Sequence, residues 1–417
     1  MTTEEEMTIN ERRKYLRKMK LRYSKATRQE RGQLLDEMEA VTGLHRKSLV
    51  RLMHSNLERK SRSKERHKTY GPEVSNAIRV IAASLDFPCA ERLTPNLVWL
   101  AKHLAAHDEL QVSDPLLLQL EQISISTVQR CLKTIVQDQP HLARRRPRPA
   151  NSVLRDVPMG RIPWDVSEPG HFETDLVHHC GTSATGEYVH TLQMVDVTTG
   201  WTETRAVLGR SYVVMEDAFQ YILERVPFAV REIHPDNGSE FFNRHMVRFW
   251  KETVKGLHLS RSRPYHKNDN PFVEQRNGHP IRTYLGYDRL DTVAQTRAVN
   301  QLYDKLWLYL NFFQPVMRVA EKTVISVDGQ RTRTRRRYDD ARTPFDRACA
   351  MNAIPDERCA QLAALRDQTN PRQLLAEIWE LIDYIFSLPN AVPGDTQNVY
   401  DTLEYKNDRD PEEPETR

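Results

Sequence analysis

The sequence predicts a multidomain chain: an α/β core, preceded by all-helical regions and followed by a small C-terminal region of strands and helices. Three observations lead to this fold class. The chain has 417 residues, which is too long for one hydrophobic core and indicates two or three domains. Residues 11–57 show helical periodicity throughout, whereas residues 171–290 alternate between strand-like and helix-like patterns.

The first predicted domain, residues 1–57, has the pattern of a helix-turn-helix. One helix has apolar residues at helical spacing and is followed by Gly43; these residues are Leu34, Leu35, Met38 and Val41. The next helix presents basic side chains outward, namely His45, Arg46, Lys47 and Arg51. Such a helix suits the major groove of DNA, although a helical hairpin with a solvated basic face has the same pattern.

Two basic segments flank a second helical domain. A connector, 58–70, leads into residues 71–140, where Arg130 and Lys133 lie on the outward face of a helix that resembles another recognition helix. Packing explains this second helix-turn-helix equally well. The Arg- and Pro-rich linker 141–165 cannot form a regular helix, and we expect it to lie extended across DNA through Arg144, Arg145 and Arg146.

Residues 166–290 form the predicted catalytic core, and its first strand contains HFETDLV at 171–177. Strand alternation places Glu173 and Asp175 on one face. Asp175 is our preferred ligand for a metal ion and Glu173 is its rival, while an edge strand with a solvated acidic face is the simpler alternative. Asp196, on the hairpin around 198–200, is a candidate fourth carboxylate or a turn cap.

Two further carboxylates complete the candidate site. Asp236 lies in the turn of HPDNGSEFF, after a short buried strand, where open α/β sheets place their ligands. Glu274 follows Pro271 by three residues, so a helix starting at Pro271 can aim it toward the sheet, with Asp269 as a possible substitute. The gaps between the three carboxylates are 61 and 38 residues (236 − 175 and 274 − 236). Such a trio can hold two divalent ions for phosphoryl transfer.

With these motifs in this order, residues 165–290 resemble the D,D,E catalytic core of bacterial insertion-sequence transposases that are similar to retroviral integrases. The resemblance implies an α/β ribonuclease H-like core, a mixed five-stranded sheet with flanking helices. It implies two Mg²⁺ ions bound by Asp175, Asp236 and Glu274, with Mn²⁺ as a substitute. Retroviral relatives carry basic residues one and two turns beyond this Glu; here Gly278 and Ile281 stand there, and Arg276 and Arg282 are the nearest replacements.

The C-terminal region, 291–388, is predicted to contain a long apolar helix, a hairpin turning at Asp328-Gly329 and an amphipathic helix over 370–388. Alternate arginines line one face of the hairpin, and DNA contact relieves their mutual repulsion; these are Arg331, Arg333, Arg335 and Arg337. The acidic residues 389–417 are predicted to be a disordered tail.

The charge distribution and the cysteine usage restrict which partners and which cellular compartment are expected. Residues 11–68 carry 19 Lys and Arg against 7 Asp and Glu, whereas residues 389–417 carry 8 acids against 3 bases, an asymmetry typical of a polyanion binder. The five cysteines form no CxxC pair, so neither a disulfide framework nor a zinc knuckle is expected. No apolar run is long enough for a membrane span. We expect a bacterial cytoplasmic, nucleoid-associated protein.

These observations predict a DNA transposase that binds terminal inverted repeats, cleaves 3′ ends and joins them to target DNA. Its partners would be double-stranded DNA at element ends and target, and further copies of itself, at least a dimer, because both ends must be held together; an accessory ATPase is left open. A metal-dependent nuclease that cuts without joining is the main alternative. A DNA-binding repressor with an inactive core is the alternative from another class, although such a repressor would not need all three carboxylates.

Overall fold

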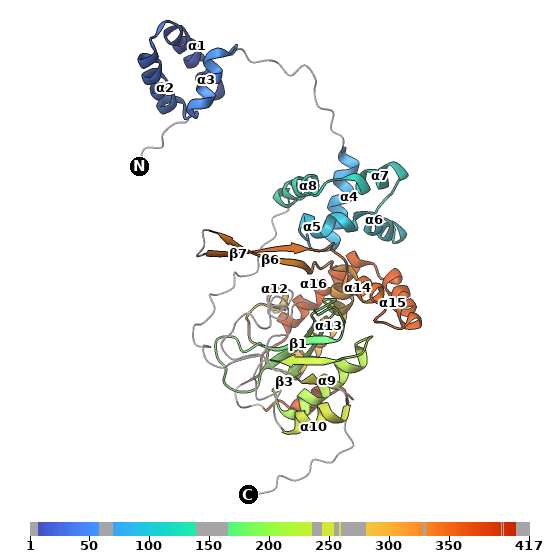
Figure 1. The fold of residues 1–417 in the computed structure, drawn as a ribbon. Helices are drawn as coiled ribbons and strands as arrows, with labels where there is room; N and C mark the ends of the chain where they lie inside the picture. Colours follow the sequence, from blue (N-terminus) through green and yellow to red (C-terminus); the bar gives the residue numbers. More distant parts are fainter. Residues whose placement is uncertain are drawn as a thin grey trace. The chain divides into compact units, whose positions relative to one another are not determined.

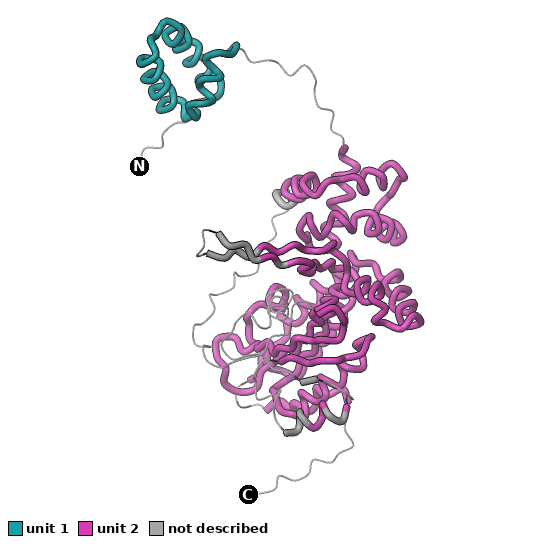
Figure 2. The backbone as a smooth tube through the Cα atoms, viewed as in Figure 1, with its two compact units in different colours: residues 1–69 teal, residues 70–417 magenta. Residues whose placement is uncertain are grey.

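The computed structural model describes residues 7–57, 70–138, 166–235, 244–253, 258–259, 281–327, 331–392, 394 and 396–405. The chain forms two compact units, residues 1–69 and residues 70–417 (Figure 2). In the part of the chain so described, no helix has both the length and the apolar character needed to cross a membrane.

The first unit is a bundle of three helices: α1 (Ile9–Lys25), α2 (Arg28–Thr42) and α3 (Arg46–His54). Capping boxes start the first two helices, Thr8 with Glu11 and Thr27 with Glu30. Gly43 ends α2 in the left-handed conformation, with φ 67°, which a glycine adopts at little cost. The helical prediction for this region is confirmed.

Three of the four apolar residues whose spacing predicted α2 are buried. The fourth, Val41, is 45% exposed. Thr42 is buried in its place, because it follows Leu35 and Met38 at seven and four residues and so lies on the same face of α2.

The second unit begins with five α-helices that belong to the same hydrophobic core as the sheet. They are α4 (Pro72–Ser84), α5 (Ala90–Leu93), α6 (Leu97–Ala106), α7 (Asp114–Gln122) and α8 (Ile125–Asp138), with a 3-10 turn η1 (Thr94–Asn96). Asn96 Nδ2 donates to Ala341 O over 3.0 Å, and Gln314 Nε2 donates to Leu85 O over 2.9 Å. These helices are thereby attached to the C-terminal region.

A mixed sheet of five strands forms the centre of this unit (Figure 1). The strands are β1 (His171–His178), β2 (Val189–Asp196), β3 (Thr202–Leu208), β4 (Glu232–Pro235) and β5 (His258–Leu259), in the order β3-β2-β1-β4-β5. The first three pair antiparallel, whereas β4 is parallel to β1 and to β5. The prediction of five strands is confirmed, although β5 has only two residues.

Helices flank the sheet and cover its free edge. They are α9 (Tyr212–Arg225), α10 (Arg244–Thr253), α12 (Arg282–Leu285) and α13 (Val293–Leu308), the last continuing as a π-helix η3 (Tyr309–Phe313). Asn300 donates to and accepts from the backbone of Ala206, and Asn311 does the same with Thr202. Two side-chain amides therefore satisfy backbone groups of the edge strand β3, which blocks pairing with another strand.

The C-terminal region contains the predicted hairpin and three helices. Its elements are β6 (Val319–Val327), β7 (Arg331–Tyr338), α14 (Pro344–Ala350), α15 (Asp356–Gln368), α16 (Pro371–Ser387) and a 3-10 turn η4 (Val399–Thr402). The strands pair antiparallel, which confirms the hairpin, while the predicted turn at Asp328-Gly329 lies outside the described residues. Asn370 caps α16 as predicted.

Two predictions for this region are corrected by the structure. Cys349 in α14 and Cys359 in α15 form a disulfide, which the absence of a CxxC motif did not anticipate because these helices bring together cysteines ten residues apart.

Disorder was predicted from Pro389 onward, yet residues up to Tyr405 are bound to the second unit. Asp217 on α9 accepts hydrogen bonds from the backbone N–H groups of Glu404 and Tyr405, at 3.1 and 2.8 Å.

Candidate active site

The middle of β1 carries the two rival carboxylates of the sequence prediction. Glu173 is 1% exposed and acts electrostatically on the half-buried Arg318, which precedes β6. Asp175 is partly exposed, and its Oδ1 accepts a hydrogen bond from the backbone N–H of Leu176 over 2.8 Å. A ligand for a solvent-borne ion must be accessible, so the burial of the two side chains favours Asp175.

Gln193 lies directly opposite Asp175 on β2. Residues directly opposite each other in an antiparallel pair share one face of the sheet, so the two side chains are neighbours. The Gln193 side chain is fully buried, and neither its Oε1 nor its Nε2 has a hydrogen-bond partner among the residues that the structure describes. An unsatisfied buried amide is costly and often marks a functional position.

The end of β4 lies beside Asp175. Thr174 pairs with Pro235 in the parallel ladder between β1 and β4, so the last residue of β4 is level with the residue before Asp175. Asp236 is the next residue in the sequence. Asp236 and Glu274 both lie outside the described residues, as does the alternative ligand Asp269.

Asp196 is a cap and not a fourth ligand of the site. Its Oδ1 accepts from the backbone N–H groups of Gly170 and His171, at 2.8 and 3.1 Å. Its Oδ2 accepts from the N–H and the hydroxyl of Thr199, at 2.7 and 2.6 Å. Burial raises the pKa of Asp196, and these hydrogen bonds act in the opposite direction. Oδ2 thus closes the turn between β2 and β3, and Oδ1 holds the backbone at the start of β1.

Arg282 joins α12 to the end of β1. Its Nη2 donates to the carbonyl oxygen of His178 over 2.8 Å, and its Nη1 donates to Gly286 O over 3.1 Å. Burial lowers the pKa of Arg282, while nearby groups including Asp175 act to raise it. The guanidinium therefore lies within the electrostatic reach of Asp175 and fixes where the chain re-enters the core after residue 280.

Buried histidines line the same end of the sheet. His179 Nε2 lies 2.8 Å from Thr191 Oγ1, which in turn contacts the hydroxyl of Tyr303 on α13. Burial lowers the pKa of His179 to about 3 and that of His190 to about 3, so both rings are neutral at physiological pH. Among the residues that the structure describes, no group of three or more His, Cys, Asp or Glu is placed to hold a metal ion.

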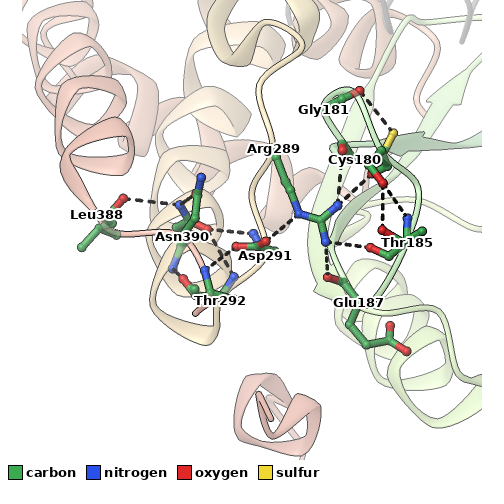
Figure 3. A network of polar contacts seen from close by, with 12 residues as sticks. Cys180, Gly181, Thr185, Glu187, Arg289, Asp291, Thr292, Leu388 and Asn390 are labelled. Atoms are coloured by element: carbon green, nitrogen blue, oxygen red, sulfur yellow. Dashed lines mark hydrogen bonds and ion pairs between the residues drawn. The ribbon is translucent and has the colours of Figure 1, made fainter. Parts of the chain in front are cut away.

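Arg289 holds the loop between β1 and β2 (Figure 3). Its Nε donates to Asp291 Oδ2 over 2.6 Å, and its Nη atoms donate to four backbone carbonyl oxygens of that loop. The acceptors, at 2.8 to 3.4 Å, belong to Cys180, Ser183, Thr185 and Glu187. Asp291 Oδ1 also accepts from the N–H of Ala391 over 2.7 Å. Sequence reasoning did not identify Arg289, because its partners are mainly backbone groups distant in the sequence.

The predicted DNA-contacting residues differ in what they already bind. In the first unit Lys47 and Arg51 are exposed, whereas Arg46 forms an ion pair with Asp36 and donates to Gly32 O over 3.3 Å, which joins α3 to α2.

On α8, Lys133 is exposed and Arg130 bonds to Ser126 and Thr127 of its own helix. Arg335 and Arg337 on β7 are exposed, and Arg333 belongs to the same strand. Arg144, Arg145, Arg146 and Arg276 lie outside the described residues.

Comparison with known proteins identifies the core. Residues 165–267 match the family model described as "Integrase core domain". A relative from Sinorhizobium fredii (strain NBRC 101917 / NGR234), "Uncharacterized protein y4rM", is 35% identical over 305 residues, which cover 73% of this chain and 87% of the relative. The chain therefore belongs to this integrase-core family, and its predicted resemblance to integrase-like transposase cores and its ribonuclease H-like fold class are confirmed.

Two solved structures are also similar. The catalytic core domain of BIV integrase is 14% identical, with a TM-score of 0.28, covering 44% of this chain and 95% of that one. The HTLV-2 integrase catalytic core domain in complex with magnesium (dimeric form) is 16% identical, with a TM-score of 0.27, covering 36% of this chain and 90% of that one.

Proposed function

We propose that this protein is an insertion-sequence DNA transposase that binds terminal inverted repeats, cleaves 3′ ends and joins them to target DNA. The observation that carries this proposal is the alignment of β4 with β1: Pro235 pairs with Thr174, and the partly exposed Asp175 follows on β1. Consecutive Cα atoms are about 3.8 Å apart, so Asp236 cannot be far from that edge. Two carboxylates on neighbouring parallel strands suit a shared metal site.

Glu274 is the proposed third ligand, and its short connection in the chain to Arg282 supports this role. Arg282 lies eight positions after Glu274 in the sequence, and its guanidinium is bound to the carbonyl of His178 at the end of β1. The chain that carries Glu274 is thus held to the strand that carries Asp175. We propose that all three carboxylates meet there.

Mg²⁺ fits the described part of this site, and Mn²⁺ has similar preferences. Asp175 supplies a hard, accessible oxygen, and the unsatisfied amide of Gln193 beside it can bind an ordered water or orient a ligand. Two Mg²⁺ ions held by Asp175, Asp236 and Glu274 would supply stabilisation of the charge on the attacking and leaving oxygens of a phosphodiester. The chain itself presents Asp175 on β1, and the buried β1–β2 pair excludes water beneath it.

DNA and further copies of the chain are the proposed partners. The exposed Lys47, Arg51, Lys133, Arg335 and Arg337 would contact element ends and target DNA in the cytoplasm. A dimer or larger assembly would hold two ends together. Arg144, Arg145, Arg146 and Arg276, which lie outside the described residues, belong to the same proposed DNA contact, and a need for an accessory ATPase is left open.

A strand-transfer assay tests this function. The purified chain would be incubated with a labelled element-end duplex, a plasmid target and Mg²⁺, beside Asp175→Asn and Asp236→Asn. We expect joined product from the wild type and at least about a hundredfold less from either variant, since loss of even an outer partner of a metal ligand costs about 10- to 100-fold. Asp356→Asn, an exposed carboxylate on α15, is the control and should keep full activity.

The alternatives give different results in the same assay. Cleavage without joining would favour the nuclease, and DNA binding with neither, insensitive to chelator, would favour the repressor. Activity that survives in Asp175→Asn but is lost in Glu173→Gln would overturn the choice between the two β1 carboxylates.

A further inference from the structure

The turn after α4 has an unusual backbone. Asp86 and Phe87 follow one another with φ of 54° and 53°, in the left-handed region that residues other than glycine rarely adopt. Aspartate tolerates this region better than most residues, whereas a bulky phenylalanine does not. The N–H of Phe87 donates to Ala82 O over 2.8 Å, which closes the end of α4 in this conformation. Such backbone strain persists only where the surroundings hold it, and it often lies at functional positions.

The surroundings of this turn come from two distant parts of the chain. The carbonyl oxygen of Leu85 accepts from Gln314 Nε2 over 2.9 Å, at the end of the π-helix η3. Asp86 Oδ2 accepts from the hydroxyl of Tyr284 on α12 over 3.5 Å. The helical module, which we define as residues 70–138, therefore contacts both η3 and α12 through adjacent residues of one turn.

Tyr284 is the buried member of this contact. Its side chain is 2% exposed, and its ring packs edge-on against Trp379 of α16, with ring centroids 5.5 Å apart. Burial raises the pKa of Tyr284, and the charge of Asp86 acts in the same direction, so the hydroxyl stays protonated at neutral pH and donates to the carboxylate. A buried hydroxyl that loses its acceptor is costly, so the position of Tyr284 depends on Asp86.

The helix α12 extends the contact to the strand of the active site. It has only four residues, so Tyr284 and Arg282 move together. Arg282 Nη2 donates to the carbonyl oxygen of His178 at the end of β1 over 2.8 Å. Asp175 lies three positions earlier on the same strand. A continuous series of contacts thus runs from Asp86 through Tyr284 and Arg282 to the strand that carries Asp175.

We propose that Asp86 is a positioning residue for the active site: it holds Tyr284, and with it α12 and Arg282, against the end of β1. The attachment of the helical module is thereby coupled to the position of Asp175; that this site is catalytic rests on the proposed function. A displacement of about 1 Å at a reacting group can cost about a hundredfold in rate. A small shift of the helical module is therefore enough to change the rate of reaction.

Substitutions at Asp86 separate the carboxylate from the turn. Asp86→Gly removes the carboxylate but suits the left-handed backbone, so the turn is retained. Asp86→Asn also tolerates this backbone and keeps an oxygen that can accept from Tyr284. Tyr284→Phe removes the hydroxyl and keeps the ring that packs on Trp379. The matched control is Tyr221→Phe, because Tyr221 donates to Asp304 over 2.9 Å in a Tyr–Asp pair that joins α9 to α13.

Hydrogen exchange of the α12 amides, followed by mass spectrometry in the full-length chain, tests the positioning independently of activity. We expect Asp86→Gly and Tyr284→Phe each to raise exchange in the peptide 282–290 about 3- to 10-fold, the effect of losing one hydrogen bond. Asp86→Asn and Tyr221→Phe should leave it unchanged. The double variant of Asp86→Gly and Tyr284→Phe should exchange no faster than either single variant, because both remove the same contact.

The strand-transfer assay tests the coupling to the active site. Asp86→Gly and Tyr284→Phe should raise the Mg²⁺ concentration that gives half the maximal rate about 3- to 10-fold, whereas Asp86→Asn and Tyr221→Phe should not. Thermal unfolding of each variant checks that the fold is retained, since a general loss of stability would not act on the Mg²⁺ requirement alone.

Unchanged α12 exchange in Asp86→Gly would overturn the proposal, as would additive effects in the double variant. Normal strand transfer in Tyr284→Phe, with α12 exchange raised, would also overturn it, because α12 would then move without consequence for the active site. If the wild type does not join DNA but the exchange results are as expected, the positioning of α12 by Asp86 stands and the transposase assignment fails.

Discussion

At the scale of single residues, Gln193 shows how the site departs from what stability alone would select. Its amide is buried beside Asp175 and has no hydrogen-bond partner in the described part of the chain, which costs about 1–3 kcal/mol. Met has a similar shape and no such groups. We expect Gln193→Met to raise the free energy of unfolding by about 1 kcal/mol in chelator and to lower Mg²⁺-dependent strand transfer. Urea unfolding and the strand-transfer assay measure the two effects.

The control for this substitution is Gln373→Met on the surface of α16, where the amide already bonds to Glu377. Gln373→Met should change the free energy of unfolding by less than about 0.5 kcal/mol and should leave strand-transfer activity unchanged. If Gln193→Met proves destabilising while activity is retained, its amide has a structural partner and no role at the site.

The residue scale also shows what alternation can and cannot predict. The pattern of HFETDLV was sufficient to place Glu173 and Asp175 on one face of a strand. It was not sufficient to choose between them, because the choice depends on burial, which is set by the tertiary fold: Glu173 is buried and Asp175 is partly exposed. Gln193 gave no signal at all, since its position opposite Asp175 follows only from the register of β1 and β2.

At the scale of elements, Arg289 connects the loop after β1 to the start of α13. All five of its N–H donors are directed to oxygen atoms, four of them backbone carbonyls of the loop 180–187. Lysine keeps the charge but has three donors and no planar fork. We therefore expect Arg289→Lys to lower the free energy of unfolding by about 2–3 kcal/mol, with the loss measured by urea unfolding.

Arg297→Lys is the matched control for this element, because Arg297 is exposed and donates to the carbonyl of Asp401. Its effect should stay below about 1 kcal/mol. Equal losses of unfolding free energy in Arg289→Lys and Arg297→Lys would mean that the planar fork of Arg289 does not contribute to stability.

Elements with strong local signals were predicted well, and those fixed by distant partners were not. The hairpins β2–β3 and β6–β7 and the helix α16 follow from turn residues, alternation and caps within a few residues. The order of residues 389–405 does not, because it depends on the Asp217 carboxylate of α9 and on the Arg297 guanidinium of α13. Composition indicated a tail, and tertiary contacts overrode it.

For the whole molecule, buried histidines make stability depend on pH. The pKa values of His179 and His190 are about 3 in the folded chain against 6.5 ordinarily, because burial disfavours the charged ring. Below pH 6.5 the unfolded chain therefore takes up protons that the folded chain does not, and stability falls as pH falls toward 3. At pH 5 the loss should be about 2 kcal/mol for each histidine relative to pH 7.

Urea unfolding at pH 7 and pH 5 measures this loss, and a double variant, His179→Gln with His190→Gln, isolates its cause. Asp196 and Asp217, whose pKa values burial raises, act in the opposite sense and remain in both proteins, so they cancel in the comparison. We expect the double variant to lose less stability than the wild type between the two pH values. An undiminished loss in the double variant would place the acid sensitivity in other groups.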